Sequence, residues 1–175
     1  MFFTLIVYCF NNQIRFNKNG KFNLPVGKRD FNSNIRTKLK DFVSKLQEQK
    51  PNLMNIDFAN FDIELLDKNS FVYCDPPYLI TTASYNENGG WTINDEKKLL
   101  DFLDKLNSKK IKFALSNVTQ HKGKENKILI DWAKKNKYNI NYLNYNYKNS
   151  NYHSKNTDKD TIEVLVTNYN VEEVK

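Results

Sequence analysis

Apolar residues recur along the chain in two periods, one typical of helices and one typical of strands. The clearest helical run begins at Ser33 or Asn34 and repeats apolar residues every three or four positions until Pro51 ends it. Similar runs predict helices from Asn94 to about Leu106 and over 126–136. Asparagine or serine at the start of each run is a good cap, because its side chain accepts hydrogen bonds from free backbone N–H groups.

Short apolar runs between these helices are typical of β-strands. The predicted strands cover 53–58, 70–74, 112–116, 138–147 and 161–168, with a helical turn at 63–66. The apolar opening, residues 1–10, is predicted to be a buried strand or helix. Residues 11–32 are rich in turn formers and predict a loop or a short hairpin. Alternating strands and helices predict an α/β fold, one sheet with helices on both faces.

Composition adds a basic character to this picture. The 175 residues carry a net charge of +7, and 39% of them are hydrophobic, enough for one core. The excess is concentrated between Arg15 and Lys50, with ten Lys or Arg against three Asp or Glu. Such a segment attracts an anionic partner such as nucleic acid. The alternative is a well-solvated surface, which explains Lys38, Lys40 and Lys45 on the predicted helix.

Several functional classes are disfavoured. The opening segment is far short of the ~20 apolar residues that span a bilayer, so no membrane association is expected. Cys9 and Cys74 lie in apolar surroundings without metal-type spacing, which predicts buried thiols in a reducing cytoplasm. Two histidines and two distant cysteines are a poor set of ligands, so no metal site is predicted.

The strongest chemical motif is the DPPY segment (75–78), directly after the apolar run FVYC. Ligand sites in open α/β sheets lie just beyond the carboxyl ends of strands, where this segment falls. Asp-Pro-Pro is also an ordinary strand-ending turn. A chance DPPY in a chain of this size, however, is roughly a one-in-a-thousand event at average residue usage.

The residue types in this segment suit methylation of an exocyclic amino group. Such a nitrogen is a poor nucleophile because its lone pair is delocalised into the ring. The Asp75 carboxylate and the Pro76 carbonyl can each accept one of its hydrogen bonds and free the lone pair for attack. Pro76 and Pro77 stiffen the backbone, and the Tyr78 ring offers a face on which an extruded base can stack.

The order of motifs resembles a known family. RFN-x-x-G-x-FN-x-P-x-G (15–27) precedes DPPY, and LSN (115–117) and a strand ending in TNY (163–169) follow it. This order resembles the Dam-type, D12 class adenine-specific DNA N6-methyltransferases. The resemblance implies S-adenosylmethionine as methyl donor, duplex DNA as substrate and a Rossmann-like methyltransferase sheet.

The resemblance also implies roles for individual residues. The catalytic set is Asp75, Pro76, Pro77 and Tyr78; Asp57, Phe58 and Asp75 would bind the cofactor; Asn11, Arg15, Pro25 and Lys28 would contact DNA. Residues 83–85 and 89–91 resemble the loop over the extruded base, and Ser150 and Lys155 a phosphate-contacting loop. Ser116 and Asn117 of the LSN block are expected to shape the sheet edge.

One family motif has no counterpart. Family members open with Phe-x-Gly-x-Gly, where glycine lets the backbone approach the cofactor, but none of the five glycines here forms Gly-x-Gly. We therefore expect an N-terminally truncated methyltransferase, with a remnant of the DNA-recognition segment at 1–50 and the C-terminal part of the catalytic domain at 51–175. It would be one half of a split enzyme completed by a separate polypeptide. The alternatives are an inactive DNA-binding remnant and a methyltransferase for RNA or protein amides.

Overall fold

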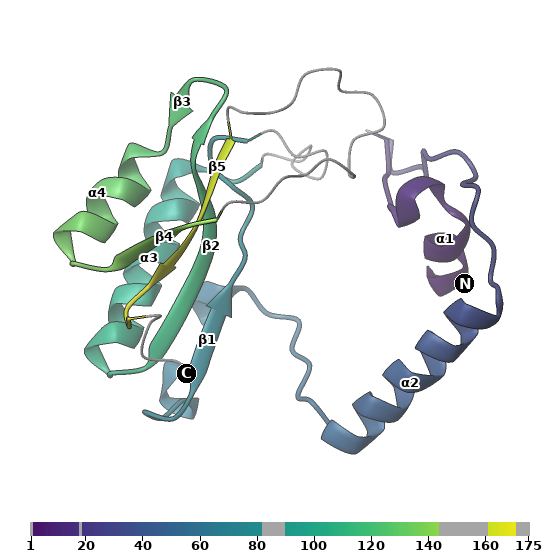
Figure 1. Ribbon diagram of the computed structural model, residues 1–175, viewed down its shortest axis with the longest axis horizontal. Coiled ribbons are helices and arrows are strands. Elements are labelled where there is room, and N and C mark those ends of the chain that lie inside the picture. Colours follow the sequence, from purple (N-terminus) through teal and green to yellow (C-terminus); the bar gives the residue numbers. More distant parts are fainter. Residues whose placement is uncertain (1, 18, 82–89, 144–160, 171–175) are drawn as a thin grey trace. The chain divides into compact units, whose positions relative to one another are not determined.

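The structure is a computed structural model that describes residues 2–17, 19–81, 90–143 and 161–170 (Figure 1). Internal contacts divide the chain into two compact units, Met1–Asn55 and Ile56–Lys175. We call them unit 1 and unit 2 and describe each by itself. The predicted division at residue 50 concerns what each part does, and this remains a prediction.

Unit 1 opens with helix α1 (Phe2–Tyr8) and the 3-10 turn η1 (Phe10–Asn12). The apolar opening is therefore a helix, and only part of it is buried. Val7 and Cys9 are buried, whereas Phe3, Leu5, Tyr8 and Phe10 are exposed. The chain around Cys9 pairs with a later segment through Phe10 N–H to the Pro25 carbonyl (3.1 Å) and Gly27 N–H to the Tyr8 carbonyl (2.7 Å).

The loop between these segments is a short hairpin, as predicted. An antiparallel bridge joins Phe16 to Phe22, and their rings meet edge to face at 6.1 Å. The Asn17 side chain holds the turn, since its Oδ1 accepts from the backbone N–H groups of Asn19 (2.9 Å) and Lys21 (3.0 Å). Asparagine side chains commonly stabilise turns in this way.

Helix α2 (Ser33–Gln49) confirms the clearest helical prediction. Its cap is Asn32, whose Oδ1 accepts from Ile35 N–H at 3.0 Å, so the predicted cap at Ser33 or Asn34 is wrong by one or two residues. The helix ends at Lys50 in the left-handed region, just before Pro51. None of its residues is buried.

Unit 2 is built on a mixed sheet with the order β1-β2-β5-β4, and β3 pairs with β2. The strands are β1 (Phe71–Cys74), β2 (Lys112–His121), β3 (Lys124–Glu125), β4 (Asn139–Tyr142) and β5 (Thr161–Thr167). β1 and β2 are parallel, whereas β5 is antiparallel to both β2 and β4. Helix α3 (Ile93–Ser108) connects β1 to β2, and α4 (Lys127–Lys135) connects β3 to β4.

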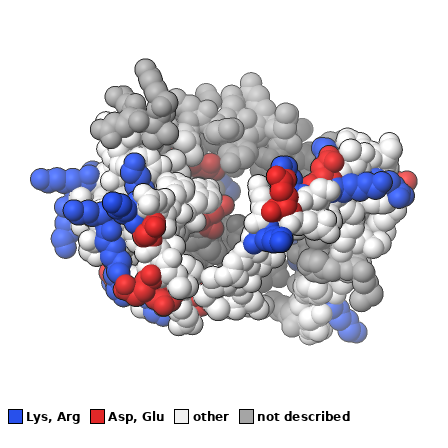
Figure 2. Space-filling model, turned by 90° about the horizontal axis from the view of Figure 1, so that it is seen from below, with Lys and Arg blue, Asp and Glu red and all other residues white. Residues whose placement is uncertain are grey.

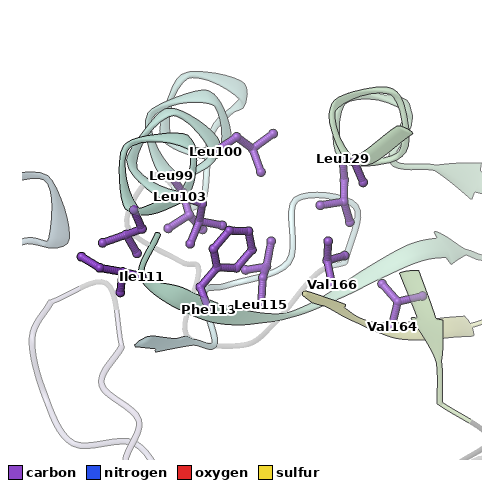
Figure 3. Close-up of a cluster of buried hydrophobic side chains, with 11 residues drawn as sticks. Leu99, Leu100, Leu103, Ile111, Phe113, Leu115, Leu129, Val164 and Val166 are labelled. Carbon is purple, nitrogen blue, oxygen red and sulfur yellow. The ribbon is translucent and has the colours of Figure 1, made fainter. Parts of the chain in front are cut away.

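The core of unit 2 lies between one face of the sheet and both helices. Leucines of α3 and α4 pack against Phe113 and Leu115 of β2 and against Val164 and Val166 of β5. Figure 3 shows these strand side chains pointing toward the two helices. Because α3 and α4 share this face, the predicted cover of both faces by helices is not found among the described residues.

At β1, the opposite face of the sheet exposes apolar residues. Side chains alternate along β1, so Val72 and Cys74 join the core while Phe71 and Tyr73 point away from it. Phe71 is 55% and Tyr73 58% exposed. The ring of Phe71 meets Tyr169 at 6.1 Å, away from the core that α3 and α4 share.

Other predicted elements either do not form or begin at a different residue in the structure. The segment 53–58 forms no strand; it is extended and exposed up to the 3-10 turn η2 (Phe58–Asn60). Helix α3 is capped by Thr92 with Asp95 in a capping box, not by Asn94. The turn η3 (Ile63–Leu65) and a helix after Asn126, α4 (Lys127–Lys135), are confirmed, and the part of the predicted strand 138–147 beyond residue 143 lies outside the described residues. No helix among the described residues is long and apolar enough to cross a membrane.

Candidate active site

The DPPY segment begins where β1 ends, at the carboxyl edge of the sheet. Cys74 pairs with Leu115 in the parallel register, so Asp75 leaves the strand beside Ser116. Pro76, Pro77 and Tyr78 are half-buried, while Asp75 is exposed. The segment closes in a turn in which the Tyr78 carbonyl accepts from the backbone N–H and the hydroxyl of Thr81, both at 3.1 Å.

The Tyr78 hydroxyl joins the DPPY segment after β1 to Ser116 on β2. Its hydroxyl donates to Asp75 Oδ1 at 3.1 Å and lies 3.1 Å from Ser116 Oγ. Because a phenol has a single proton, Ser116 is the donor in the second bond when Tyr78 donates to Asp75. The three side chains then form a chain from Ser116 through Tyr78 to Asp75.

Burial keeps the Tyr78 phenol and the Cys74 thiol neutral. Burial, together with the neighbouring Asp75 carboxylate, raises the pKa of Tyr78 to about 12 against the opposing effect of Ser116. Burial also raises the pKa of the Cys74 thiol to about 11. Tyr78 therefore keeps its proton, and with it its donor role, at neutral pH.

A buried carboxylate lies behind this edge. Glu96 is completely buried and accepts from Trp91 Nε1 (2.6 Å), Asn126 Nδ2 (2.9 Å) and Asn117 Nδ2 (3.3 Å). Asn126 is also the cap of α4, so Glu96 links both helices to the strand that carries Ser116. Sequence reasoning did not identify Glu96, although an acidic residue in line with Leu99, Leu100 and Leu103 on one helical face was a usable signal.

The predicted cofactor pair lies at another part of unit 2. Asp57 is exposed and caps η2, with its Oδ1 accepting from Ala59 N–H at 2.8 Å. Phe58 is half-buried and packs on Trp91 and Phe102, with ring centroids 6.0 and 6.1 Å away. One Asp57 oxygen is thus free of the cap, whereas the Phe58 ring already belongs to the core edge.

The predicted DNA-contacting residues all lie in unit 1 and are exposed. The Arg15 guanidinium donates through Nε (3.2 Å) and Nη2 (3.0 Å) to the Asn23 carbonyl, which aims it along the hairpin. Asn11 has a positive φ of 52°, a conformation that asparagine tolerates better than most residues. The Pro25 carbonyl pairs with Phe10, and Lys28 lies directly after the closely packed Gly27.

Basic side chains are distributed over both units. Figure 2 shows lysine and arginine side chains at the surface of each, with acidic side chains among them. On α2, for example, Lys45 and Glu48 form an exposed ion pair at 2.7 Å. Exposed pairs of this kind contribute little, so charge alone does not define a DNA-binding face.

Some residues for which the sequence predicted a role lie outside the part of the chain that the structure describes. Residues 83–85, Ser150 and Lys155 lie outside the described residues, and so does Gly89. Trp91 is described through its bond to Glu96. Within the described part of the chain, no three His, Cys, Asp or Glu side chains gather as metal ligands would.

Comparisons with known proteins agree with this geometry. Residues 1–160 match the family model described as D12 class N6 adenine-specific DNA methyltransferase. The chain is 47% identical over 174 residues to the Type II methyltransferase M.FokI of Planomicrobium okeanokoites, and 46% identical over 173 residues to the modification methylase StsI of Streptococcus sanguinis. Each comparison covers 95% of this chain and 26% of the relative, so the chain spans about a quarter of the length of these curated relatives.

A more distant relative matches a shorter stretch. The Type II methyltransferase M.MjaIII of Methanocaldococcus jannaschii is 40% identical over 115 residues, which is 62% of this chain and 38% of the relative. The family model covers most of the chain, including the DPPY segment and the hairpin of unit 1. The chain therefore belongs to the D12 class of N6 adenine-specific DNA methyltransferases.

Proposed function

We propose that this chain supplies the catalytic edge and part of the DNA-reading surface of a site-specific methyltransferase acting on adenine N6 in duplex DNA. One observation carries the proposal. The DPPY segment leaves the carboxyl end of β1 with its carboxylate and phenol hydrogen-bonded to each other. The mixed sheet behind it would be part of a Rossmann-like methyltransferase sheet. The names of two relatives, Type II methyltransferase and modification methylase, support a role in restriction-modification. The proposed place of this activity is the cytoplasm.

In the proposed reaction, Asp75 and Pro76 orient the adenine amino group. The Tyr78 hydroxyl occupies Asp75 Oδ1, which leaves Oδ2 to accept one N6 hydrogen bond, and the Pro76 carbonyl accepts the other. The nitrogen lone pair would then attack the methyl group of a sulfonium donor, so that the N–C bond forms as the S–C bond breaks and the neutral thioether leaves with the bonding electrons. One N6 proton would be released to water. The Tyr78 ring would stack on the extruded base.

S-adenosylmethionine would supply the methyl on a positively charged sulfur. The described residues fit part of this molecule: the free Asp57 oxygen can accept from its adenine amino group, and Phe58 lies beside it. They do not include the Gly-x-Gly that the family places near its methionine part. We propose that another segment, in the same protein or on a separate polypeptide of a split enzyme, completes the cofactor site.

The apolar side chains of β1 that point away from the core of unit 2 support this completion. Exposed Phe71 and Tyr73 are the kind of apolar surface that folded domains normally bury against another element. A partner that brought the glycine segment could cover these side chains at the same time. The chain without it would keep the DPPY edge but bind the cofactor poorly.

Transfer of labelled methyl from S-adenosylmethionine to unmethylated duplex DNA tests the proposed activity. The chain would be assayed alone and together with the polypeptide encoded directly before it. We expect transfer to adenine that disappears in Asp75→Ala, with Asp101→Ala, an exposed helix residue, as the control. Transfer that survives Asp75→Ala, or that goes to RNA or protein instead, would refute the proposal.

DNA reading by unit 1 needs its own test. Arg15→Ala should weaken specific binding, with a cost of about 1–3 kcal/mol if the guanidinium contacts a base edge. Arg36→Ala is the matched control, because Arg36 lies on α2 with its guanidinium 5.2 Å from the Phe31 ring. Equal losses in the two variants would mean that Arg15 contributes only general charge.

A further inference from the structure

The hydroxyl of Ser116 has a contact that the LSN block alone did not suggest. It lies 3.1 Å from the Tyr78 hydroxyl, 38 positions away in the chain. Its neighbours Leu115 and Asn117 are buried on the helix-covered side of β2, so Ser116 faces the other side. Ser116 is half-buried there, and its hydroxyl has a polar partner that an apolar side chain would not bind.

The strand that carries Ser116 is firmly held. β2 pairs with β1 on one side and with β5 on the other, and Ser116 itself is in register with Leu165. The next residue, Asn117, is completely buried and donates to Glu96. The Ser116 hydroxyl is therefore fixed by the best-anchored part of the sheet.

The DPPY segment lacks such support of its own. β1 has only four residues, and its pairing with β2 ends at Cys74 and Leu115. Beyond that point, the Tyr78 hydroxyl is the polar side-chain group that joins the segment to β2. A fixed hydroxyl at this point limits the movement of both the tyrosine ring and the carboxylate.

We propose that Ser116 is a positioning residue for the methyl-transfer reaction, acting through Tyr78 on Asp75. This inference rests on the proposed function. Ser116 donates to the Tyr78 oxygen, which directs the phenol proton to Asp75 Oδ1 and leaves Oδ2 facing the amino group. Orientation of reacting groups is sensitive to small errors, and a displacement of about 1 Å can cost ~100-fold in rate.

The test compares Ser116→Ala with Ser116→Thr in the methyl-transfer assay. We expect Ser116→Ala to lower kcat by about 10- to 100-fold with KM for DNA and cofactor changed by less than about 3-fold, and Ser116→Thr to restore most of the rate. Ser108→Ala is the matched control, because that hydroxyl only donates to the Lys105 carbonyl at the end of α3. Full activity of Ser116→Ala would overturn the proposal.

A double-mutant cycle separates action through Tyr78 from a general loss of structure. If Ser116 acts through the phenol, Ser116→Ala should have little further effect once Tyr78→Phe has removed the hydroxyl. Equal losses in both backgrounds would show that Ser116 acts by another route, and the proposal would be wrong. Melting temperatures of all variants identify any that lost rate because they unfolded.

A measurement that does not depend on catalysis distinguishes failure of this inference from failure of the proposed function. If the wild-type protein transfers no methyl even with the completing segment present, the proposed function fails, and the contact is then tested by NMR on protein with 13C-labelled tyrosine rings. The Tyr78 signal, identified by its loss in Tyr78→Phe, should shift in Ser116→Ala and return in Ser116→Thr. An unchanged signal in Ser116→Ala would overturn the inference.

Discussion

Different interactions stabilise the interior of each of the two units. Unit 2 has a continuous apolar core in which Leu103, Phe113 and Leu129 have no exposed surface. Among the described residues of unit 1, only Val7 and Cys9 are buried, and α2 has no buried residue. Backbone pairing around Cys9 and Gly27 holds unit 1 instead.

This difference matches the tasks proposed for the units. An active site needs groups held within a fraction of an ångström, and a packed core behind β2 supplies that rigidity. A DNA-reading surface must leave its side chains free for a partner, and the Arg15 hairpin does so at the cost of a small core. The difference between the units can be tested by making the same change in each.

The largest difference is expected between Phe113→Ala and Phe42→Ala. Phe113 is fully buried against Tyr138 (5.2 Å) and Trp132 (6.3 Å), so its removal should cost about 3–5 kcal/mol. Phe42 is 59% exposed on α2, and its removal should change stability by less than about 0.5 kcal/mol. Urea denaturation followed by circular dichroism measures both. A cost for Phe42→Ala close to that of Phe113→Ala would mean that α2 is covered in solution.

The next effect concerns a buried and an exposed carboxylate. Glu96→Gln replaces an acceptor of three N–H groups by a side chain with its own N–H donors, which should cost about 2–3 kcal/mol. Glu48→Gln on α2 breaks an exposed ion pair and should cost below about 0.5 kcal/mol. Thermal and urea unfolding of the two variants give the comparison. If both variants melt like the wild type, the Glu96 network does not stabilise unit 2.

A third comparison is confined to unit 1. A Cβ on Gly27 would lie 2.6 Å from the Cys9 carbonyl oxygen, so Gly27→Ala must push two backbone segments apart at a cost of about 1–3 kcal/mol. The neighbouring Val26→Ala, at a side chain 82% exposed, should stay within about 0.5 kcal/mol. Hydrogen exchange at the Phe10 and Gly27 amides is the local readout. Unchanged protection in Gly27→Ala would show that the segments can separate without loss.

Sequence periodicity predicted several regular elements, because apolar residues recur at the spacing of the helix or strand that they form. The helical run before Pro51 became α2, and the apolar run before DPPY became β1. Caps were less predictable because several suitable residues stand near each helix start, and backbone geometry selects one of them. Thr92 was selected over Asn94 since Asp95 completes its capping box. Residues 53–58 have strand-like composition but no pairing partner in the described structure.

The site was predictable only where it is local in sequence. The DPPY motif after an apolar run was correctly placed at the carboxyl end of a strand, since strand ends and turn residues are neighbours in the chain. The contacts of Ser116 with Tyr78 and of Glu96 with Asn126 join positions 38 and 30 residues apart. No short pattern encodes such pairings. They arise from the register of β1 on β2 and from the packing of two helices on one face.

The smallest expected effect is the difference between two tyrosines at high pH. Burial raises the pKa of Tyr78 in unit 2 to about 12, whereas the hydrogen bond to Asp30 raises the pKa of the exposed Tyr8 in unit 1. A tyrosine whose pKa is raised on folding contributes stability that is fully present below its ordinary pKa near 10. This contribution is lost as the pH rises through the pKa of the folded state. For Tyr78 the window is therefore between pH 10 and about 12.

Tyr78→Phe should accordingly flatten the fall in stability between pH 10 and 12, while Tyr8→Phe should change it less because solvent screens an exposed hydroxyl. Urea midpoints at pH 8, 10 and 11 measure the slopes, and comparison with the wild type cancels the titration of lysines. Parallel slopes for the wild type and Tyr78→Phe would mean that the phenol is not shielded at the sheet edge. The hydrogen bonds that join Ser116, Tyr78 and Asp75 would then be accessible to water. The rigid part of unit 2 would include β2 but not the DPPY segment.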